Sequence, residues 1–164
     1  MNYEIIELTD YGNTKATIYS VLEEGEKLTL FDKFLEEYEK IYPNEILAIL
    51  DVIEDISNVY GVREHLIKSN EGAFGDGVVA LFDSPYKKLR LYGVQYGTTI
   101  LILGGGGTKS KSIKAYQEDP KLDKEAGIMK KISREITQRI KDKEIKLTSH
   151  KLVGNLNFNE DDTE

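Results

Sequence analysis

The sequence has no cysteine and no tryptophan, and its 164 residues include only two histidines and three prolines. The absence of cysteine excludes disulfide scaffolds, Cys-ligated zinc, iron–sulfur clusters and thiol nucleophiles. His65 and His150 lie 85 positions apart in the chain, which argues against a metal site built from several histidines. We therefore expect neither a metal nor another cofactor.

Long hydrophobic runs are also missing. The uninterrupted apolar stretches are far shorter than the roughly 18 residues that a membrane span needs. The N-terminus, Met1-Asn2-Tyr3-Glu4, lacks the basic and then apolar segment of a secretory signal. These absences predict a cytoplasmic protein that has no membrane partner.

The composition nevertheless supports a packed core, because 40% of the residues are hydrophobic and there are ten Tyr and five Phe. The chain length suits one domain. We expect a single domain over residues 1–153, followed by an acidic and disordered tail over residues 154–164.

The formal net charge of −7 hides an uneven distribution along the chain. Residues 1–85 carry a net charge of −12, residues 86–151 carry +9, and residues 152–164 carry −4. A basic block inside an acidic protein hints at a polyanionic partner such as RNA. The alternative is that these cations only line a solvated helix.

Periodic apolar patterns predict the order of the elements. Runs over residues 3–8 and 16–22 read as an opening hairpin. Two helical stripes follow, interrupted by Pro43. Their apolar members are Phe31, Phe34, Leu35, Tyr38 and Ile41 in the first, and Ile46, Ile49, Leu50, Ile53 and Ile56 in the second. The outward faces of both helices are acidic.

The second half predicts a three-stranded meander and a long helix. Residues 78–82, 89–94 and 99–103 read as strands joined by short connections, and the last of them is expected to end at Gly104. Asp119-Pro120 resembles an N-cap followed by proline at the first helical position. An apolar stripe follows at Leu122, Met129, Ile132, Ile136 and Ile140. The predicted fold is α+β: a twisted antiparallel sheet with two N-terminal helices and a C-terminal helix.

The strongest candidate for chemistry is the segment that begins at Lys87. Strand alternation predicts that Lys88, Arg90 and Tyr92 share one face, with leucines on the other. Lysine and arginine would contact phosphates, and Tyr92 would stack on a base or transfer a proton. The alternative is an ordinary solvated sheet face.

Four consecutive glycines, Gly104 to Gly107, follow the meander and precede a lysine-bearing segment. Backbone N–H groups at Gly105 and Gly106 would form an anion-binding nest beside Lys109 and Lys111. The segment has no G-x-x-x-x-G-K-[ST] pattern, so it is not a nucleotide-binding P-loop. A flexible or tightly packed strand exit is the other interpretation. The phosphate-binding candidates are thus Lys87, Lys111, Lys114, Gly105 and Gly106.

The element order, together with Lys-Leu-Arg-Leu-Tyr, Gly97, residues 100–103, Lys109 and Lys111, resembles the RelE/ParE superfamily of bacterial toxins. The similarity spans roughly residues 3–140, and the nearest group is the phage-derived, HigB-type branch. Three features differ from that family. Glycines replace a usual aromatic-Lys-Lys stretch, the C-terminus is acidic, and the net charge is negative.

The resemblance implies a type II toxin that cleaves translated, ribosome-associated mRNA without a metal. It implies that Lys88 or Lys109 accepts a proton or binds phosphate, that Arg90 stabilises charge, and that Tyr92 stacks or transfers a proton. It also implies a cognate antitoxin, of the helix-turn-helix kind in this branch. Two alternatives stay open: a protein binder of the same fold, as in the gyrase-directed branch, and a catalytically silent regulatory member.

Overall fold

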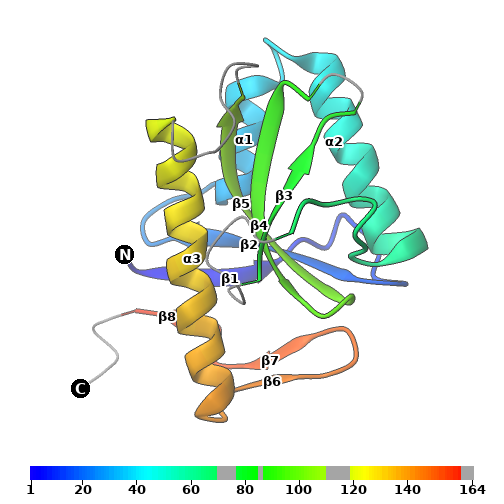
Figure 1. Ribbon diagram of the computed structural model, residues 1–164. Coiled ribbons are helices and arrows are strands. Elements are labelled where there is room, and N and C mark those ends of the chain that lie inside the picture. The colour runs from blue at the N-terminus through cyan, green and yellow to red at the C-terminus, as the bar shows by residue number, and fades with distance from the viewer. Residues whose placement is uncertain (70–76, 85–86, 110–118, 160–164) are drawn as a thin grey trace.

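The computed structural model describes residues 1–69, 77–84, 87–109 and 119–159. Over these residues the chain forms a mixed α+β structure in which one mostly antiparallel sheet lies between helices (Figure 1). The expected α+β class is therefore confirmed.

The sheet has six strands in the order β3-β4-β5-β2-β1-β8. Their bounds are β1 Tyr3–Glu7, β2 Thr17–Glu23, β3 Val78–Phe82, β4 Leu89–Tyr96, β5 Ile100–Thr108 and β8 Asn157–Phe158. The hairpin β1-β2 and the meander β3-β4-β5 are antiparallel, as expected. They join through β2 and β5, which run parallel because the long segment between them crosses over the sheet.

Helices α1 (Leu30–Tyr38) and α2 (Pro43–Asp55) cover one face of the sheet, and α2 continues into a π-helical turn over Ile56–Tyr60. The Thr29 hydroxyl caps α1 by accepting a hydrogen bond from the Asp32 N–H at 3.1 Å. Proline at the first position of α2 needs no N–H partner. Ile41, which the sequence placed in the apolar stripe, is 67% exposed because α1 ends before it.

Helix α3 (Pro120–Lys141) covers the opposite face. The Asp119 carboxylate accepts hydrogen bonds from the N–H groups of Lys121 and Leu122, which confirms the expected cap. Four of the five residues in the expected apolar stripe are buried, namely Leu122, Met129, Ile132 and Ile136. The fifth, Ile140, is partly buried. Across the described residues, no helix combines the length and apolar character that crossing a membrane requires.

The sheet separates two apolar cores. One lies under α3 and includes Tyr92, Val94 and Ile102, and the other lies under α1 and α2 and includes Leu89, Leu91 and Leu101. Consecutive strand residues thus alternate between the cores, as the pleat of a strand requires. Because both faces are covered, the meander has no broad solvated side.

The expectation that the last meander strand ends at Gly104 is wrong, because β5 continues through Gly104 to Gly107 and ends at Thr108. Gly106 and Gly107 pair with Leu91 and Arg90 of β4. A Cβ atom on Gly104 would lie 2.3 Å from the Met129 Sδ atom of α3. The glycines therefore let the helix approach the strand backbone closely.

The C-terminal segment is more ordered than the sequence suggested. A hairpin of β6 (Ile145–Leu147) and β7 (Leu152–Gly154) follows α3, and β8 then pairs with β1. The Phe158 ring stacks on Tyr3 with centroids 4.8 Å apart, and the Arg139 guanidinium lies 3.7 Å from the Phe158 centroid. These contacts hold residues that were expected to be a disordered tail. Residues 160–164 of that tail lie outside the described residues.

Candidate functional site

Four side chains gather at the end of the sheet where β3 ends, β4 begins and β5 ends. We call Phe82, Arg90, Tyr92 and Lys109 the cationic-aromatic cluster. Phe82 of β3 lies opposite Arg90 of β4 in the strand register. Lys109 directly follows β5, and its N–H donates to the Lys88 carbonyl at 2.8 Å. Three neighbouring strands thus bring together residues that lie far apart in the sequence.

The Phe82 ring is shared by two cations. The Arg90 guanidinium carbon lies 4.9 Å from the ring centroid, and the Lys109 Nζ atom lies 5.7 Å from it. Both distances are within the range of attractive cation–π contacts. Arg90 also donates from Nη1 to the Tyr92 hydroxyl oxygen at 3.4 Å. The cluster therefore concentrates positive charge around aromatic groups.

The burial of this cluster differs from the sequence expectation. Arg90 and Tyr92 were expected on a solvated strand face, but both have a relative exposure of 0%. Tyr92 belongs to the core under α3, and the Arg90 side chain contacts the Phe82 ring and the Tyr92 hydroxyl. A ring with no exposed surface offers no face to a base. Its hydroxyl instead contacts Arg90 and can orient that guanidinium.

Lys88 does not join the cluster. Its side chain is 57% exposed, and its Nζ atom lies 4.0 Å from Glu45 of α2, which covers the opposite face of the sheet. The expectation that Lys88 shares a strand face with Arg90 is therefore wrong. Strand β4 begins at Leu89, whose N–H donates to the Asp83 carboxylate at 2.6 Å. The alternation rule does not apply to the residue before the strand.

The other phosphate-binding candidates are scattered or outside the described residues. Lys87 is exposed and has a φ of 54° in the turn before β4. Gly105 and Gly106 are buried in β5 and lack the positive φ on which the proposed anion nest relies. Lys111 and Lys114 lie outside the described residues.

Sequence reasoning missed Phe82. It was read only as the last residue of an apolar strand. Its role at the cluster follows from strand register, which places it opposite Arg90. The sequence did predict that the runs at residues 78–82 and 89–94 are neighbouring antiparallel strands. Finding Phe82 opposite Arg90 also requires the exact register of the two strands, which the sequence of the connecting residues does not fix.

A second polar group lies between α1 and α3. Lys121 donates to the Tyr38 hydroxyl at 2.7 Å and pairs with Glu37. Burial raises the pKa of the neighbouring Glu125 carboxyl above its ordinary value, although Lys121 and Lys124 oppose that shift. The Glu125 carboxylate lies against Gly105, where a Cβ atom would be 2.6 Å from its Oε2 atom.

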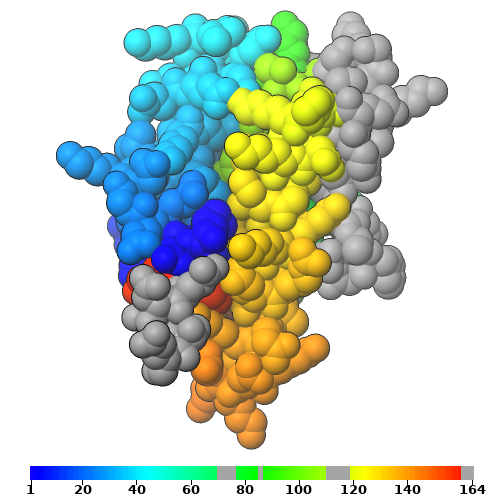
Figure 2. All heavy atoms as spheres, turned by 90° about the vertical axis from the view of Figure 1, so that its left-hand side faces the viewer, coloured from blue at the N-terminus to red at the C-terminus, as the bar shows by residue number. Residues whose placement is uncertain are grey.

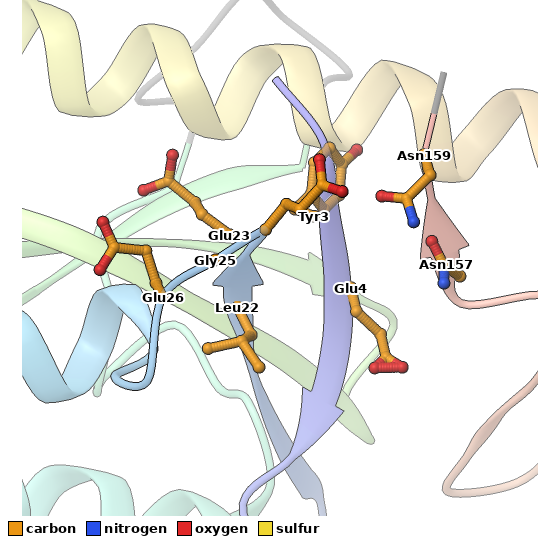
Figure 3. Close-up of a pocket in the computed structure, with 9 residues that line it drawn as sticks. Tyr3, Glu4, Leu22, Glu23, Gly25, Glu26, Asn157 and Asn159 are labelled. Carbon is orange, nitrogen blue, oxygen red and sulfur yellow. The ribbon is translucent and has the colours of Figure 1, made fainter. Parts of the chain in front are cut away.

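The hollow drawn in Figure 3 is acidic and does not contain the cluster. It lies beside the β1-β2 hairpin, and its lining includes Glu4, Glu23 and Glu26. Glu23 and Glu26 lie on one side of Tyr3, and Lys33 pairs with both, at 3.8 and 3.2 Å. Over the residues that the structure describes, no group of three or more His, Asp or Glu side chains is arranged to hold a metal ion.

Comparisons with known proteins give no relative for this chain. No family model matches the sequence, and neither the search of curated proteins nor the search of solved structures found a match.

Proposed function

We propose that the chain is the toxin of a type II toxin-antitoxin system and acts as a metal-independent endoribonuclease on translated mRNA. The carrying observation is the cationic-aromatic cluster, in which Arg90 contacts Tyr92 and shares the Phe82 ring with Lys109. The order of hairpin, two helices, meander and final helix also agrees with the RelE-like resemblance of the sequence.

The proposed reaction uses only the RNA and protein side chains. The 2′-hydroxyl oxygen attacks the adjoining phosphorus and loses its proton, while the bond from phosphorus to the 5′-oxygen breaks and that oxygen gains a proton. The products are a 2′,3′-cyclic phosphate and a free 5′-hydroxyl. Negative charge grows on the phosphate oxygens, and a fixed cation at that point lowers the barrier by several kcal/mol.

The side chains of the cluster take different parts in this proposal. Arg90 stabilises the charge that develops on the phosphate. Lys109, the half-buried amine beside the same ring, binds the phosphate or accepts the 2′-hydroxyl proton. Tyr92 orients Arg90 through its hydroxyl and does not itself stack on a base. Because Arg90 is buried, α3 or a neighbouring segment must shift for RNA to reach it.

A toxin of this type is held inactive by a cognate antitoxin, and the HigB-type resemblance points to a helix-turn-helix partner. The acidic outward surface of α1 and α2 suits such a protein. Residues 30–60 carry a net charge of −6, and Ile41 and Leu47 on this side are 67% and 59% exposed. Exposed apolar side chains amid charge are the anchors that protein interfaces use.

The test is cleavage of mRNA in a translation extract by the purified protein, with cut sites mapped by primer extension. We expect the wild-type chain to cut within translated codons, and the double variant Arg90→Ala, Lys109→Ala to cut at least a hundredfold more slowly. The variant Lys15→Ala, Lys27→Ala removes the same charge elsewhere and should cut normally. Normal cleavage by the Arg90→Ala, Lys109→Ala variant would contradict the proposal.

A second candidate is a protein binder of the same fold that has no nuclease activity. The complete burial of Arg90 and Tyr92 favours it, because neither residue contacts solvent in this conformation. Expression in bacteria separates the two candidates. Arrested translation with cut mRNA supports the nuclease, whereas a DNA-damage response with intact mRNA supports a gyrase-directed binder. No effect on growth, with or without a neighbouring antitoxin, supports a silent regulatory member.

A further inference from the structure

Helix α3 presents a line of cations to solvent, and none of them belongs to the cationic-aromatic cluster. We call Lys124, Lys131, Arg134 and Lys141 the α3 stripe. All four are exposed and lie on the outward side of the helix. Figure 2 shows α3 as a ridge that runs along this face of the molecule, from its N-terminal turns to the hairpin of β6 and β7. At 1.5 Å per residue, the stripe is about 25 Å long.

The stripe differs from the cations on the flanks of the same helix. The flanking cations serve the fold, since Lys121 pairs with Glu37 and Arg139 pairs with Glu144 at 3.6 Å. In the described parts of the chain, the four stripe residues make no ion pair and no side-chain hydrogen bond. Apart from the electrostatic effect of Lys124 on the neighbouring Glu125, their charge is therefore available to a partner.

Exposed carboxylates lie only near the ends of the helix. Asp123 is in the first turn, where it complements the helix dipole, and Asp142 is the C-cap residue, which accepts a hydrogen bond from Gln138. Between them, Glu125 and Glu135 are only partly exposed, with Glu125 against Gly105 and Glu135 accepting a hydrogen bond from the Tyr3 hydroxyl, so the fully exposed charges are all positive. The whole helix has a net charge of +4, whereas residues 30–60 on the opposite side of the sheet carry −6.

The side chains on and around the stripe indicate which kind of polyanion it would bind. None of the large exposed hydrophobic residues among the described part of the chain lies on α3. A protein interface would need apolar anchors at its centre, whereas a nucleic-acid backbone is bound through charge. The stripe also has no aromatic side chain on which a base could stack. It therefore suits phosphates and not bases.

We infer that the α3 stripe binds the phosphate backbone of RNA, without sequence preference, as a surface separate from the cationic-aromatic cluster. The choice of RNA over other polyanions rests on the proposed function, in which the cluster acts on RNA. Contacts of this kind hold a strand in register, while the contacts that choose a sequence lie elsewhere. The stripe increases affinity and does not enter the reaction.

The test is the salt dependence of binding to a labelled 2′-O-methyl oligouridine, which cannot be cleaved. The variant is Lys131→Gln, Arg134→Gln, Lys141→Gln, and its matched control is Lys15→Gln, Lys27→Gln, Lys40→Gln, which loses the same charge from exposed residues outside α3. Loss of three phosphate contacts should reduce the slope of log affinity against log salt by about 2, and lower the affinity at 50 mM salt by more than tenfold. The control should keep the wild-type slope.

Three results would overturn the inference: no binding by the wild-type chain, equal weakening in both triple variants, or competition by polyglutamate as strong as that by RNA. The last would indicate an acidic protein as the partner. The variant Lys131→Arg, Lys141→Arg should bind normally, which guards against a folding defect in the glutamine variant. Cleavage is scored separately: a chain that binds through the stripe but does not cut RNA refutes only the nuclease proposal, and a chain that cuts without using the stripe refutes only this inference.

Discussion

The two faces of the sheet are built differently. Under α1 and α2, branched and aromatic side chains from both layers fill the space, as Ile49, Ile53 and Phe34 do. Under α3, the helix lies directly against the glycines of β5, and the layer includes a buried arginine and hydrogen-bonded tyrosines. The outward surfaces differ as well. The surface of α1 and α2 is acidic and has exposed apolar groups, whereas the surface of α3 is basic and lacks them.

This difference shows how one sheet supports two kinds of surface. The layer under α1 and α2 is mainly apolar, and the polar group between α1 and the sheet is neutral: the buried Ser20 hydroxyl donates to the Leu103 carbonyl at 2.7 Å and accepts from the Phe31 N–H at 3.3 Å. A layer that encloses Arg90 must hold a charge in a fixed orientation, and it does so with the Tyr92 hydroxyl and the Phe82 ring. The α3 side is therefore the side on which we place the proposed RNA chemistry.

The largest effect is expected for a substitution at Gly106, where β5 lies close to β4. A Cβ atom on Gly106 would lie 1.9 Å from the Arg90 carbonyl oxygen, which belongs to rigid backbone. We expect Gly106→Ala to lower the free energy of unfolding by about 3 kcal/mol or more, as measured by urea denaturation. Gly25→Ala is the control: nothing lies within 4 Å, and only its φ of +81° opposes the change. Its expected cost is about 1 kcal/mol. Equal costs would contradict the packing described for β5.

The Tyr92 hydroxyl provides the next prediction. Tyr92→Phe removes the contact with Arg90 and should slow RNA cleavage by more than tenfold, while the free energy of unfolding falls by about 1 kcal/mol. Tyr96→Phe is a matched control on the same strand, because its hydroxyl binds the Ser133 carbonyl at 3.2 Å and the Thr137 hydroxyl at 3.1 Å. It should lose similar stability and keep full cleavage. A parallel loss of cleavage in both variants would show that Tyr92 has no orienting role.

The smallest expected effect concerns Glu125 and has a definite dependence on pH. Burial raises the pKa of this carboxyl in the folded chain, with Glu37 and Glu23 adding to the shift and Lys121 and Lys124 opposing it. The folded state then binds the proton more tightly than the unfolded state, so stability falls as pH rises from the unfolded pKa through the folded pKa. Glu125→Gln should raise the melting temperature at pH 7.

This gain should shrink as the pH falls through the ordinary Glu pKa of about 4.3 and disappear near about pH 3, where the wild-type carboxyl is protonated in both states. Glu36→Gln on α1 removes an exposed carboxylate from the acidic side and should change the melting temperature little at either pH. A gain from Glu125→Gln that persists unchanged at low pH would mean that the burial of the charge is not its cause.

Local patterns in the sequence predicted most elements of the fold. The Asp119 cap, the break between two helices at Pro43 and the apolar stripe of α3 depend on residues close together in the chain, and all three are confirmed. The parallel pairing of β2 with β5 depends on residues 83 positions apart, such as Thr17 and Ile100, which no local pattern specifies.

The candidate site was only partly predictable for the same reason. Strand alternation correctly placed Arg90 and Tyr92 on one face, but it could not show that both would be buried. Glycines in a row are typical of a loop. Their close packing against α3 is evident only from the tertiary contact with Met129. The order of the C-terminal residues likewise depends on Tyr3, at the other end of the chain.

The most direct measurement of the proposed difference between the two sides is lysine acylation with mass spectrometry, with and without a noncleavable 2′-O-methyl mRNA fragment. Bound RNA should protect Lys109, Lys131 and Lys141 on the α3 side and leave Lys27 and Lys40 on the acidic side as reactive as before. Protection of Lys27 and Lys40 with no change at the α3 side would contradict the assignment of RNA to that side.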